Sequence, residues 1–276
     1  GNVKKNTARP LRFMQKHGFN GQVFPVNPGS PEVLGLKAYP TVESLPDAVE
    51  HAFIMIDSAS VEGVIEQCAQ KGIAVATIYS DGFGEAGEEG IAKQKALLEK
   101  AKQCGVRLLG PNSIGAANIH SGAIMSVNAV FEMEQLITGD ISFISQSGSM
   151  MGSLMSRAMS RGYGFSKTIS VGNESDVSVG EILDALVDDD STKVILLFLE
   201  TLRDTQSLTH ALARARAAGK PVIAYKLGRS EQGDALSQSH TGAIAGNNSA
   251  IDAYFHAQGV IRVDSLETLF EISPLD

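Results

Sequence analysis

The residue types that phosphoryl chemistry uses gather first in Ser145–Ser149, where an apolar run passes into small polar residues and a helix is expected at once. Backbone N–H groups at the start of a helix, together with the helix dipole, form an anion site. Ser147, Gly148 and Ser149 are therefore candidate phosphate-binding residues, with two hydroxyl donors among them. A tight turn into a capped helix explains the same residues equally well. The segment has no Gly-Lys-Ser/Thr sequence, so it is not a Walker P-loop.

A histidine in an unusual setting is the second candidate. His240 lies in a run of small and polar residues, Ser237–Gly246, between the last clear strand and a helix. A lone histidine is more often structural than catalytic, and we assign the other five to the surface or the core. His240 differs because it is expected in a polar, glycine-rich loop rather than on an apolar face, where another group can approach its imidazole.

A carboxylate at the end of an apolar run is the third candidate. Glu200 directly follows Val194–Leu199, which is apolar enough to be a central strand. In one interpretation, Glu200 only caps a neighbouring helix or pairs with Arg203. Alternatively, its carboxylate accepts a hydrogen bond from one nitrogen of His240 and leaves the other nitrogen free to attack phosphorus. Topology alone suggests this pairing.

Short apolar, β-branched runs alternate with longer amphipathic segments, which predicts an α/β protein with parallel sheets covered on both faces. Strands are expected at 22–26, 52–56, 74–78, 106–109, 141–145, 165–170, 194–199 and 222–226. Helices are expected at 8–17, 61–71, 88–103, 150–161, 177–187, 207–218 and 248–258. The looser stretch Gly115–Thr138 has no strong periodicity and predicts the domain boundary.

Ligands of such sheets bind at the carboxyl ends of the strands, which directs attention to the loops that follow them. In the first half these loops are rich in Gly, Pro, Asn and Ser and hold no acid–base constellation, which suits close backbone approach to a nucleotide-like ligand. There is no G-x-G-x-x-G after a first strand, and Asn27-Pro28 stands where a ribose-binding acid is expected. Both departures count against an NAD-dependent oxidoreductase.

Composition sets further bounds. The chain has 276 residues, a formal net charge of −8 and 43% hydrophobic residues, which indicates a soluble globular protein and argues against a broad nucleic-acid-binding surface. Cys68 and Cys104 fall in expected helices without metal-type spacing, so no metal site is predicted. We expect a cytoplasmic protein, because no signal peptide or membrane span is visible.

Several motifs together resemble a known enzyme family. Four segments are similar to the CoA-binding domain of ADP-forming acetyl-CoA synthetases: Phe24–Pro28, Gly35–Pro40, Gly82–Gly87 and Gly110–Asn112. Three more are similar to the next domain of that family: Ser145–Gly148, Val171–Asn173 and Ser239–Ala243. The α subunit of succinyl-CoA synthetase is a more distant relative. Each motif alone is weak, but their joint order and spacing cover nearly the whole chain.

The resemblance implies a nucleoside-diphosphate-forming acyl-CoA synthetase, which converts acyl-CoA, ADP (or GDP) and phosphate into free acid, CoA and a nucleoside triphosphate. Its intermediates are an acyl phosphate and a phosphohistidine. By motif, His240 is then the phosphorylated histidine, Glu200 the residue that holds it, and Ser147–Ser149 the phosphate site. The residues expected to line the CoA site are Asn27, Pro28, Ser58, Ser80, Gly82, Phe83 and Asn112.

The resemblance also implies a domain plan. Residues 1–118 are expected to form a Rossmann-like CoA-binding domain, and residues 119–276 a flavodoxin-like, succinyl-CoA-synthetase-like domain with the phosphohistidine loop. The family's first strand and glycine-rich turn precede the position of Gly1. ATP or ADP with Mg²⁺ is expected on an ATP-grasp domain or partner subunit, and an oligomer is expected.

Three other functions compete with this one. A non-catalytic CoA- or nucleotide-binding module would keep the folds without phosphorylation of His240. An oxidoreductase would need nicotinamide binding in spite of the missing fingerprint. A hydrolase acting through Ser147 is weaker still, because Gln146-Ser147-Gly148 lacks the leading glycine of a nucleophile elbow.

Overall fold

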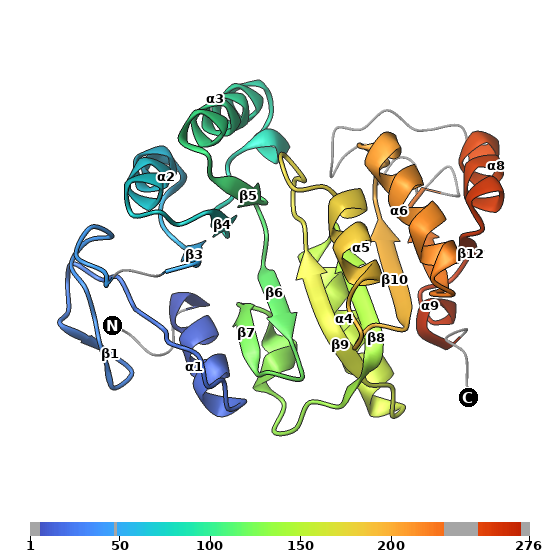
Figure 1. The fold of residues 1–276 in the computed structure, drawn as a ribbon, viewed down its shortest axis with the longest axis horizontal. Helices are drawn as coiled ribbons and strands as arrows, with labels where there is room; N and C mark the ends of the chain where they lie inside the picture. Colours follow the sequence, from blue (N-terminus) through green and yellow to red (C-terminus); the bar gives the residue numbers. More distant parts are fainter. Residues whose placement is uncertain (1–5, 47–48, 229–247, 272–276) are drawn as a thin grey trace.

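A computed structural model of the protein describes residues 6–46, 49–228 and 248–271. A three-stranded parallel sheet and a seven-stranded, mostly parallel sheet form two adjoining units (Figure 1). The predicted α/β class with a doubly wound second half is therefore confirmed. His240 lies outside the described residues.

The first unit is built on a sheet of the order β3 (His51–Ile54), β4 (Val75–Ile78) and β5 (Arg107–Leu109), all parallel. Two helices, α2 (Val61–Gln70) and α3 (Glu88–Cys104), pack against each other and this sheet. The apolar faces of these helices pack on the buried residues of β4 and β5 and form one hydrophobic core. The short 3₁₀ helices η2 (Ser58–Ser60) and η3 (Gly84–Ala86) lie at the ends of the loops that lead from β3 to α2 and from β4 to α3.

The strand predicted at 22–26 is wrong. Only Val26 pairs, in an isolated parallel bridge with Tyr39. The backbone N–H of Tyr39 donates to Pro25 O at 2.8 Å, and that of Asn27 donates to Tyr39 O at 2.8 Å. A β-strand forms backbone hydrogen bonds with a neighbouring strand over several residues, and this segment pairs at Val26 only. Nearby, β1 (Glu32–Val33) and β2 (Leu36–Lys37) form a small antiparallel hairpin.

The second sheet has the order β12-β11-β10-β8-β9-β6-β7. Its parallel part consists of β8 (Thr138–Ser145), β9 (Phe165–Ser170), β10 (Val194–Leu199), β11 (Val222–Lys226) and β12 (Ile261–Val263). The connecting helices within the described residues are α4 (Gly148–Ser160), α5 (Val179–Val187), α6 (Thr205–Ala217) and α8 (Asn248–Gln258), and α9 (Thr268–Glu271) follows the last strand. The chain passes from β8 to β9 on one side and then crosses to β10 on the other. The carboxyl ends of β8 and β10 are thus the point where strand order reverses.

The surroundings of strand β10 explain why its sequence is apolar throughout. All six of its residues are buried. Ile195, Leu197 and Leu199 face a core shared with α5, α6 and α8, whereas the residues between them face the core that contains α4. A strand covered on both faces cannot alternate with polar residues.

A hairpin occupies the stretch that predicted a domain boundary. Strands β6 (Gly115–Asn118) and β7 (Ala123–Ser126) pair antiparallel, and β6 joins β9 in the second sheet. The 3₁₀ helix η4 (Ala129–Glu132) follows. Near the N-terminus, η1 (Asn6–Ala8) leads into α1 (Arg9–Lys16), which packs against β7 and adds Phe13 to the core of the second unit. The division after residue 118 stays a prediction, because elements before it contribute to the second sheet and core.

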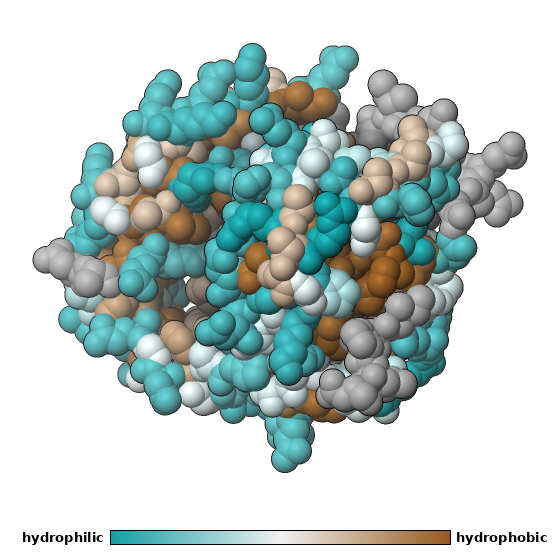
Figure 2. Space-filling view, turned by 45° about the vertical axis from the view of Figure 1, so that its right-hand side comes forward, coloured by the Kyte–Doolittle hydropathy of each residue, from teal (hydrophilic) through white to brown (hydrophobic). Residues whose placement is uncertain are grey.

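The face seen in Figure 2 carries mainly hydrophilic side chains, with smaller apolar areas between them. None of the helices within the described ranges is both long enough and apolar enough to cross a membrane.

Close packing of α5 on α6 depends on Gly180. A Cβ at this position would overlap the backbone of Ser207 and Leu208 in α6. We expect Gly180→Ala to lower the free energy of unfolding by about 1–3 kcal/mol, because the helices must move apart. Chemical denaturation followed by circular dichroism measures this change.

The matched control is Gly63→Ala in α2, where a Cβ meets nothing within 4 Å. This substitution should stabilise the protein by about 0.5–1 kcal/mol, because alanine is the better helix former. Equal effects of the two substitutions would contradict the close packing of α5 on α6.

Candidate functional site

The point of strand-order reversal brings two predicted site segments together. Ser145, the last residue of β8, lies in register with Phe198 of β10. The backbone N–H of Gln146 extends the ladder by donating to Phe198 O at 3.1 Å. The loop after β8 and the residue after β10, Glu200, therefore leave the sheet side by side, where open parallel sheets bind ligands.

The loop after β8 is tightly fixed at the start of α4. The Ser145 hydroxyl accepts from Ser147 N at 3.1 Å and donates to Ser147 O at 2.6 Å. Ser147 is the N-cap residue, but its side chain makes no capping hydrogen bond; its Oγ lies 3.4 Å from Ser149 Oγ. A Cβ at Gly148 would come within 2.7 Å of the Ile114 side chain. The three predicted phosphate-binding residues thus form the N-terminal turn of a helix, the geometry that binds anions.

Gln146 ties this loop to the end of β10. Its Oε1 accepts from Glu200 N at 2.6 Å and Thr201 N at 2.9 Å. Its Nε2 donates to Thr201 O at 3.0 Å and to Glu174 Oε2 at 2.7 Å. Glu200 itself is 9% exposed. The predicted pairing of Glu200 with His240 is not tested, because His240 lies outside the described residues.

The residues predicted to line a CoA site gather only in part. At the carboxyl ends of β3 and β4, the Ser80 hydroxyl donates to Ile56 O, and Ser80 O accepts from Asn112 N at 3.0 Å. A Cβ at Gly82 would meet Ser58 Oγ at 3.4 Å. Ser58, Ser80, Gly82 and Asn112 therefore lie in neighbouring loops.

Phe83, Asn27 and Pro28 have different surroundings. The side chain of Phe83 is fully buried in the core of the first unit, so only its backbone can face a ligand. Asn27 Oδ1 accepts from Gly29 N at 3.0 Å, which closes a turn in its own loop with Pro28 between the two. Within the described ranges, no hydrogen bond links Asn27 or Pro28 to the other predicted CoA residues.

A cation that the sequence analysis did not single out lies at these loops. Lys93 of α3 donates to Ser58 Oγ at 3.3 Å, and its ammonium group lies 5.9 Å from the centroid of the Phe83 ring. Together with the N-terminal end of the η2–α2 segment, this places positive charge at the carboxyl end of β3. Such an environment fits a phosphate-bearing ligand. The sequence could not single out Lys93, because it is one of several lysines on an amphipathic helix.

Backbone hydrogen bonds join the two units beside this site. The N–H groups of Asn173, Ser175 and Val177 donate to Pro111, Gly110 and Leu108 O at 2.9, 3.2 and 3.1 Å. A Cβ at Gly172 would overlap the backbone of the 111–112 turn. The 173–177 segment therefore runs along the end of β5, and the loops of the first unit lie directly against the second unit.

Glu85 adds a side-chain link across the same junction. Its Oε1 accepts from Gly82 N at 2.5 Å and Phe83 N at 3.1 Å, and its Oε2 accepts from Asn173 Nδ2. Asn173 also donates to Gln94 Oε1 at 2.9 Å. Although burial acts to raise the pKa of Glu85, the hydrogen bonds from Asn173 and the Gly82–Phe83 backbone bring it below its ordinary value.

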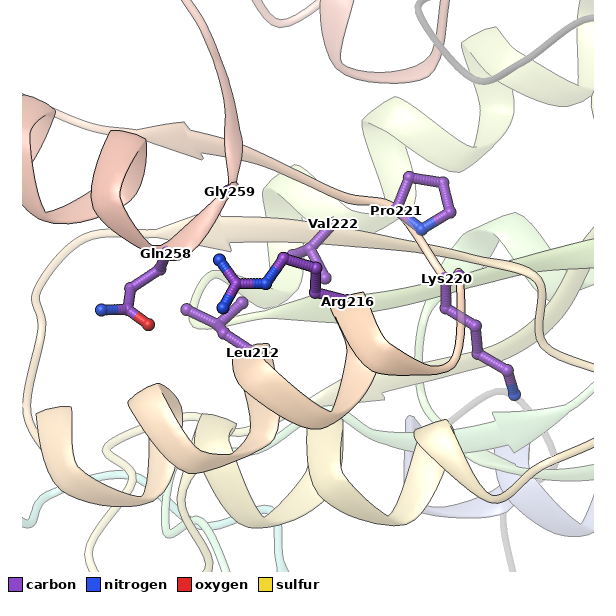
Figure 3. A pocket seen from close by; sticks show the side chains of 8 residues that line it. Leu212, Arg216, Lys220, Pro221, Val222, Gln258 and Gly259 are labelled. Carbon is purple, nitrogen blue, oxygen red and sulfur yellow. The ribbon is translucent and has the colours of Figure 1, made fainter.

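A different hollow lies at the opposite end of the second sheet. It is lined by Val222 at the start of β11, by Lys220 and Pro221 just before that strand, and by the ends of α6 and α8, with the Arg216 guanidinium across it (Figure 3). Because it is at the amino end of β11, it is remote from the predicted site residues and has no part in the assignment. Among the described residues, no cluster of His, Cys, Asp and Glu could hold a metal ion.

The two units thus define an α/β protein whose predicted phosphate-site residues lie at the strand-order reversal of a flavodoxin-like sheet. Comparison with protein families agrees. Residues 138–275 match the succinyl-CoA ligase like flavodoxin domain, and residues 2–119 match a CoA binding domain. The chain belongs to the succinyl-CoA-ligase-like family that these two domains define.

Two curated relatives carry names from one enzyme class. Acetate–CoA ligase [ADP-forming] II of Archaeoglobus fulgidus is 37% identical over 263 residues, covering 94% of this chain and 38% of the relative. The α subunit of acetate–CoA ligase [ADP-forming] I of Pyrococcus furiosus is 36% identical over 265 residues, covering 95% of this chain and 56% of that subunit. The chain thus spans between about two fifths and just over half of these relatives.

A solved structure agrees with the sequence comparisons. The dinucleotide forming acetyl-coenzyme A synthetase 1 of Candidatus Korarchaeum cryptofilum, in complex with phosphate and ADP, superposes with a TM-score of 0.91 at 32% identity. It covers 98% of this chain, which in turn covers 57% of that one. The predicted family and both predicted folds are confirmed.

The Glu85 link yields a prediction for the 82–83 loop. At neutral pH, hydrogen exchange of the Gly82 and Phe83 N–H groups should be slow, and Glu85→Ala should accelerate it, because both donors lose their acceptor. Glu89→Ala, an exposed acid on the next helix, is the control and should leave these two rates unchanged. NMR-detected amide exchange measures the rates.

The pH dependence of this protection has a definite sign. Because the pKa of Glu85 is lowered in the folded protein, the carboxylate persists at and above the ordinary range of a glutamate and is lost only as pH falls through the lowered folded value. The measured exchange rates must first be corrected for the intrinsic pH dependence of amide exchange. Loss of protection of the Gly82 and Phe83 N–H groups already at neutral pH would then contradict this role of Glu85.

Proposed function

We propose that this chain supplies the CoA-binding and phosphohistidine parts of an ADP-forming acyl-CoA synthetase. The observation that carries the proposal is the junction at the end of β8 and β10, where the N-terminus of α4 and the strand-end residue Glu200 are joined through Gln146. The matched families and the names of the relatives support the same assignment.

The overall reaction is the conversion of acyl-CoA, ADP and phosphate into the free acid, CoA and ATP. Phosphate displaces CoA from the thioester to give an acyl phosphate, and an imidazole nitrogen of His240 then attacks phosphorus while the carboxylate leaves. Neutral histidine is a suitable nucleophile near pH 7, since its ordinary pKa is about 6.5. The phosphoryl group finally passes from His240 to ADP.

Each part of the chain has a role in this scheme. The N–H groups and hydroxyls of Ser147–Ser149 stabilise charge on the transferred phosphoryl group, which needs positioning more than covalent help. Glu200 orients the imidazole of His240. The CoA phosphates lie at the loops that hold Ser58 and Lys93. Because relatives are longer than this chain, we assign ATP, ADP and Mg²⁺ to an ATP-grasp domain or partner subunit.

The phosphohistidine is the first prediction of this scheme. Mixed with a family ATP-grasp subunit and ATP, the chain should gain one phosphate that is lost in acid, and His240→Ala should abolish it while leaving the fold intact. Intact-mass analysis detects the adduct. His210→Ala, which removes a histidine on α6 whose side chain is 70% exposed, serves as the control and should retain it.

Acid-labile phosphate on the His240→Ala variant would refute the assignment. No adduct on the wild-type chain, with a partner shown to phosphorylate its own α-type subunit, would favour a non-catalytic CoA-binding module instead.

The orienting role of Glu200 gives a second prediction. Glu200→Gln should slow phosphorylation by about tenfold, because the glutamine oxygen can still accept from the imidazole but no longer carries the negative charge that strengthens this hydrogen bond. The affinity for CoA should not change, because Glu200 belongs to the second unit. Quenched-flow phosphorylation and calorimetric CoA titration measure the two quantities. Wild-type phosphorylation kinetics in the variant would exclude the orienting role.

A further inference from the structure

Glu174 is a carboxylate beside the proposed site to which no role has been assigned. It follows Gly172 and Asn173 and adopts a left-handed backbone conformation with φ of 52°, which is uncommon for a residue other than glycine. Nothing in its own side chain favours this conformation, so the surrounding contacts must hold it. Such residues are found where a side chain has to be placed in a particular direction.

Both oxygens of Glu174 are engaged. Oε1 accepts from Val179 N, in the first turn of α5, at 2.8 Å, and Oε2 accepts from Gln146 Nε2 at 2.7 Å. Burial raises the pKa of Glu174, against the opposing effects of these two hydrogen bonds and of the nearby Arg203 charge. Retaining a carboxyl group in this environment costs stability, which is common at functional sites.

The contact with Glu174 also fixes the orientation of the Gln146 amide. In the orientation observed, Oε1 meets two N–H donors and Nε2 meets two acceptor oxygens. Rotating the amide by half a turn would place its NH₂ against the N–H groups of Glu200 and Thr201 and its oxygen against acceptors. All four contacts would become repulsive, so a single orientation is specified.

We propose that Glu174 is a positioning residue that acts through Gln146 to fix the backbone at Glu200 and thereby the Glu200 carboxylate in the phosphoryl-transfer site. The chain of contacts runs from the N-terminus of α5 through Glu174 and the Gln146 amide to the end of β10. The effect of Glu174 on phosphoryl transfer rests on the proposed function. The effect of Glu174 on the backbone at Glu200 rests on the observed contacts alone.

The substitution that tests this role is Glu174→Gln. A glutamine offers one acceptor oxygen where the glutamate offers two, so it cannot accept from both Val179 N and Gln146 Nε2. Reorienting Gln146 to accept from the new NH₂ would turn its own NH₂ toward Glu200 N and Thr201 N. Every arrangement of the two amides leaves at least one donor facing another donor.

The matched control is Glu181→Ala. Glu181 belongs to the capping box at the start of α5 and pairs with Arg107. Its removal weakens the same helix end as Glu174→Gln does, but it does not touch Gln146. Thermal unfolding of both variants should show that they are folded and comparably destabilised.

Two readouts separate positioning from stability. The first is hydrogen exchange of the Glu200 and Thr201 amides by NMR, which needs no partner and no phosphorylation; Glu174→Gln should accelerate it about tenfold or more, and Glu181→Ala should not. The second is the phosphorylation rate with the ATP-grasp subunit, which should fall about tenfold in Glu174→Gln while the CoA dissociation constant is unchanged.

The outcomes are distinct. Unchanged amide exchange at Glu200 and Thr201 in Glu174→Gln, or equal acceleration in Glu181→Ala, overturns the positioning role. If the wild-type chain is not phosphorylated, the proposed function fails, and amide exchange alone decides whether Glu174 fixes this backbone. Faster exchange with an unchanged phosphorylation rate would overturn the catalytic part of the inference.

Discussion

The parallel pairing of β8 with β10 is the constraint on which the geometry of the site depends. Because β9 comes between β8 and β10 in the sequence and pairs on the other side of β8, the connections that leave β8 and β10 run to opposite faces of the sheet. In open parallel sheets, ligands bind at the carboxyl ends of strands at such a point. The register that pairs Ser145 with Phe198 sets Gln146 beside Glu200, so a polar side chain can span the two loops.

The junction between the units connects these strand ends to the first sheet. The 173–177 segment follows the loop after β9 and bonds to the end of β5, while Glu85 and Asn173 join the loops on either side. One short stretch of chain therefore contacts both the predicted phosphate site, through Glu174, and the predicted CoA loops.

The sequence predicted the fold well where burial is strongest. The bounds of β9, β10 and β11 agree with the expected strands. Strand β10 is a continuous apolar run and β11 is nearly so, as is typical of strands covered on both faces. Strand β9 instead alternates apolar or β-branched residues with serines and a lysine. The hairpin of β6 and β7 was missed, since Gly115–Asn118 reads Gly-Ala-Ala-Asn, which has weak strand propensity. The segment at 22–26 has the right residue types but lacks partners along its length.

The site was predictable only to the level of its loops. The rule for carboxyl strand ends indicated Ser147–Ser149 and Glu200, but it could not show that Gln146 joins them. Links such as Glu174 to Gln146 or Glu85 to Asn173 depend on side-chain rotamers and on segments far apart in the sequence. The burial of Phe83 was likewise hidden, because a phenylalanine after a strand looks the same whether it faces a ligand or the core.

The packing of α1 has a consequence for how the chain folds. Phe13 joins a core with Phe131, and the Arg9 guanidinium donates to Val127 O across 118 residues of sequence. During synthesis this helix emerges long before its partners, and β5 likewise waits for the 173–177 segment. Contacts of such separation form slowly. The two units are thus poorly suited to folding in turn as they leave the ribosome, and cutting the chain between them would leave each fragment with an apolar or hydrogen-bonding surface uncovered.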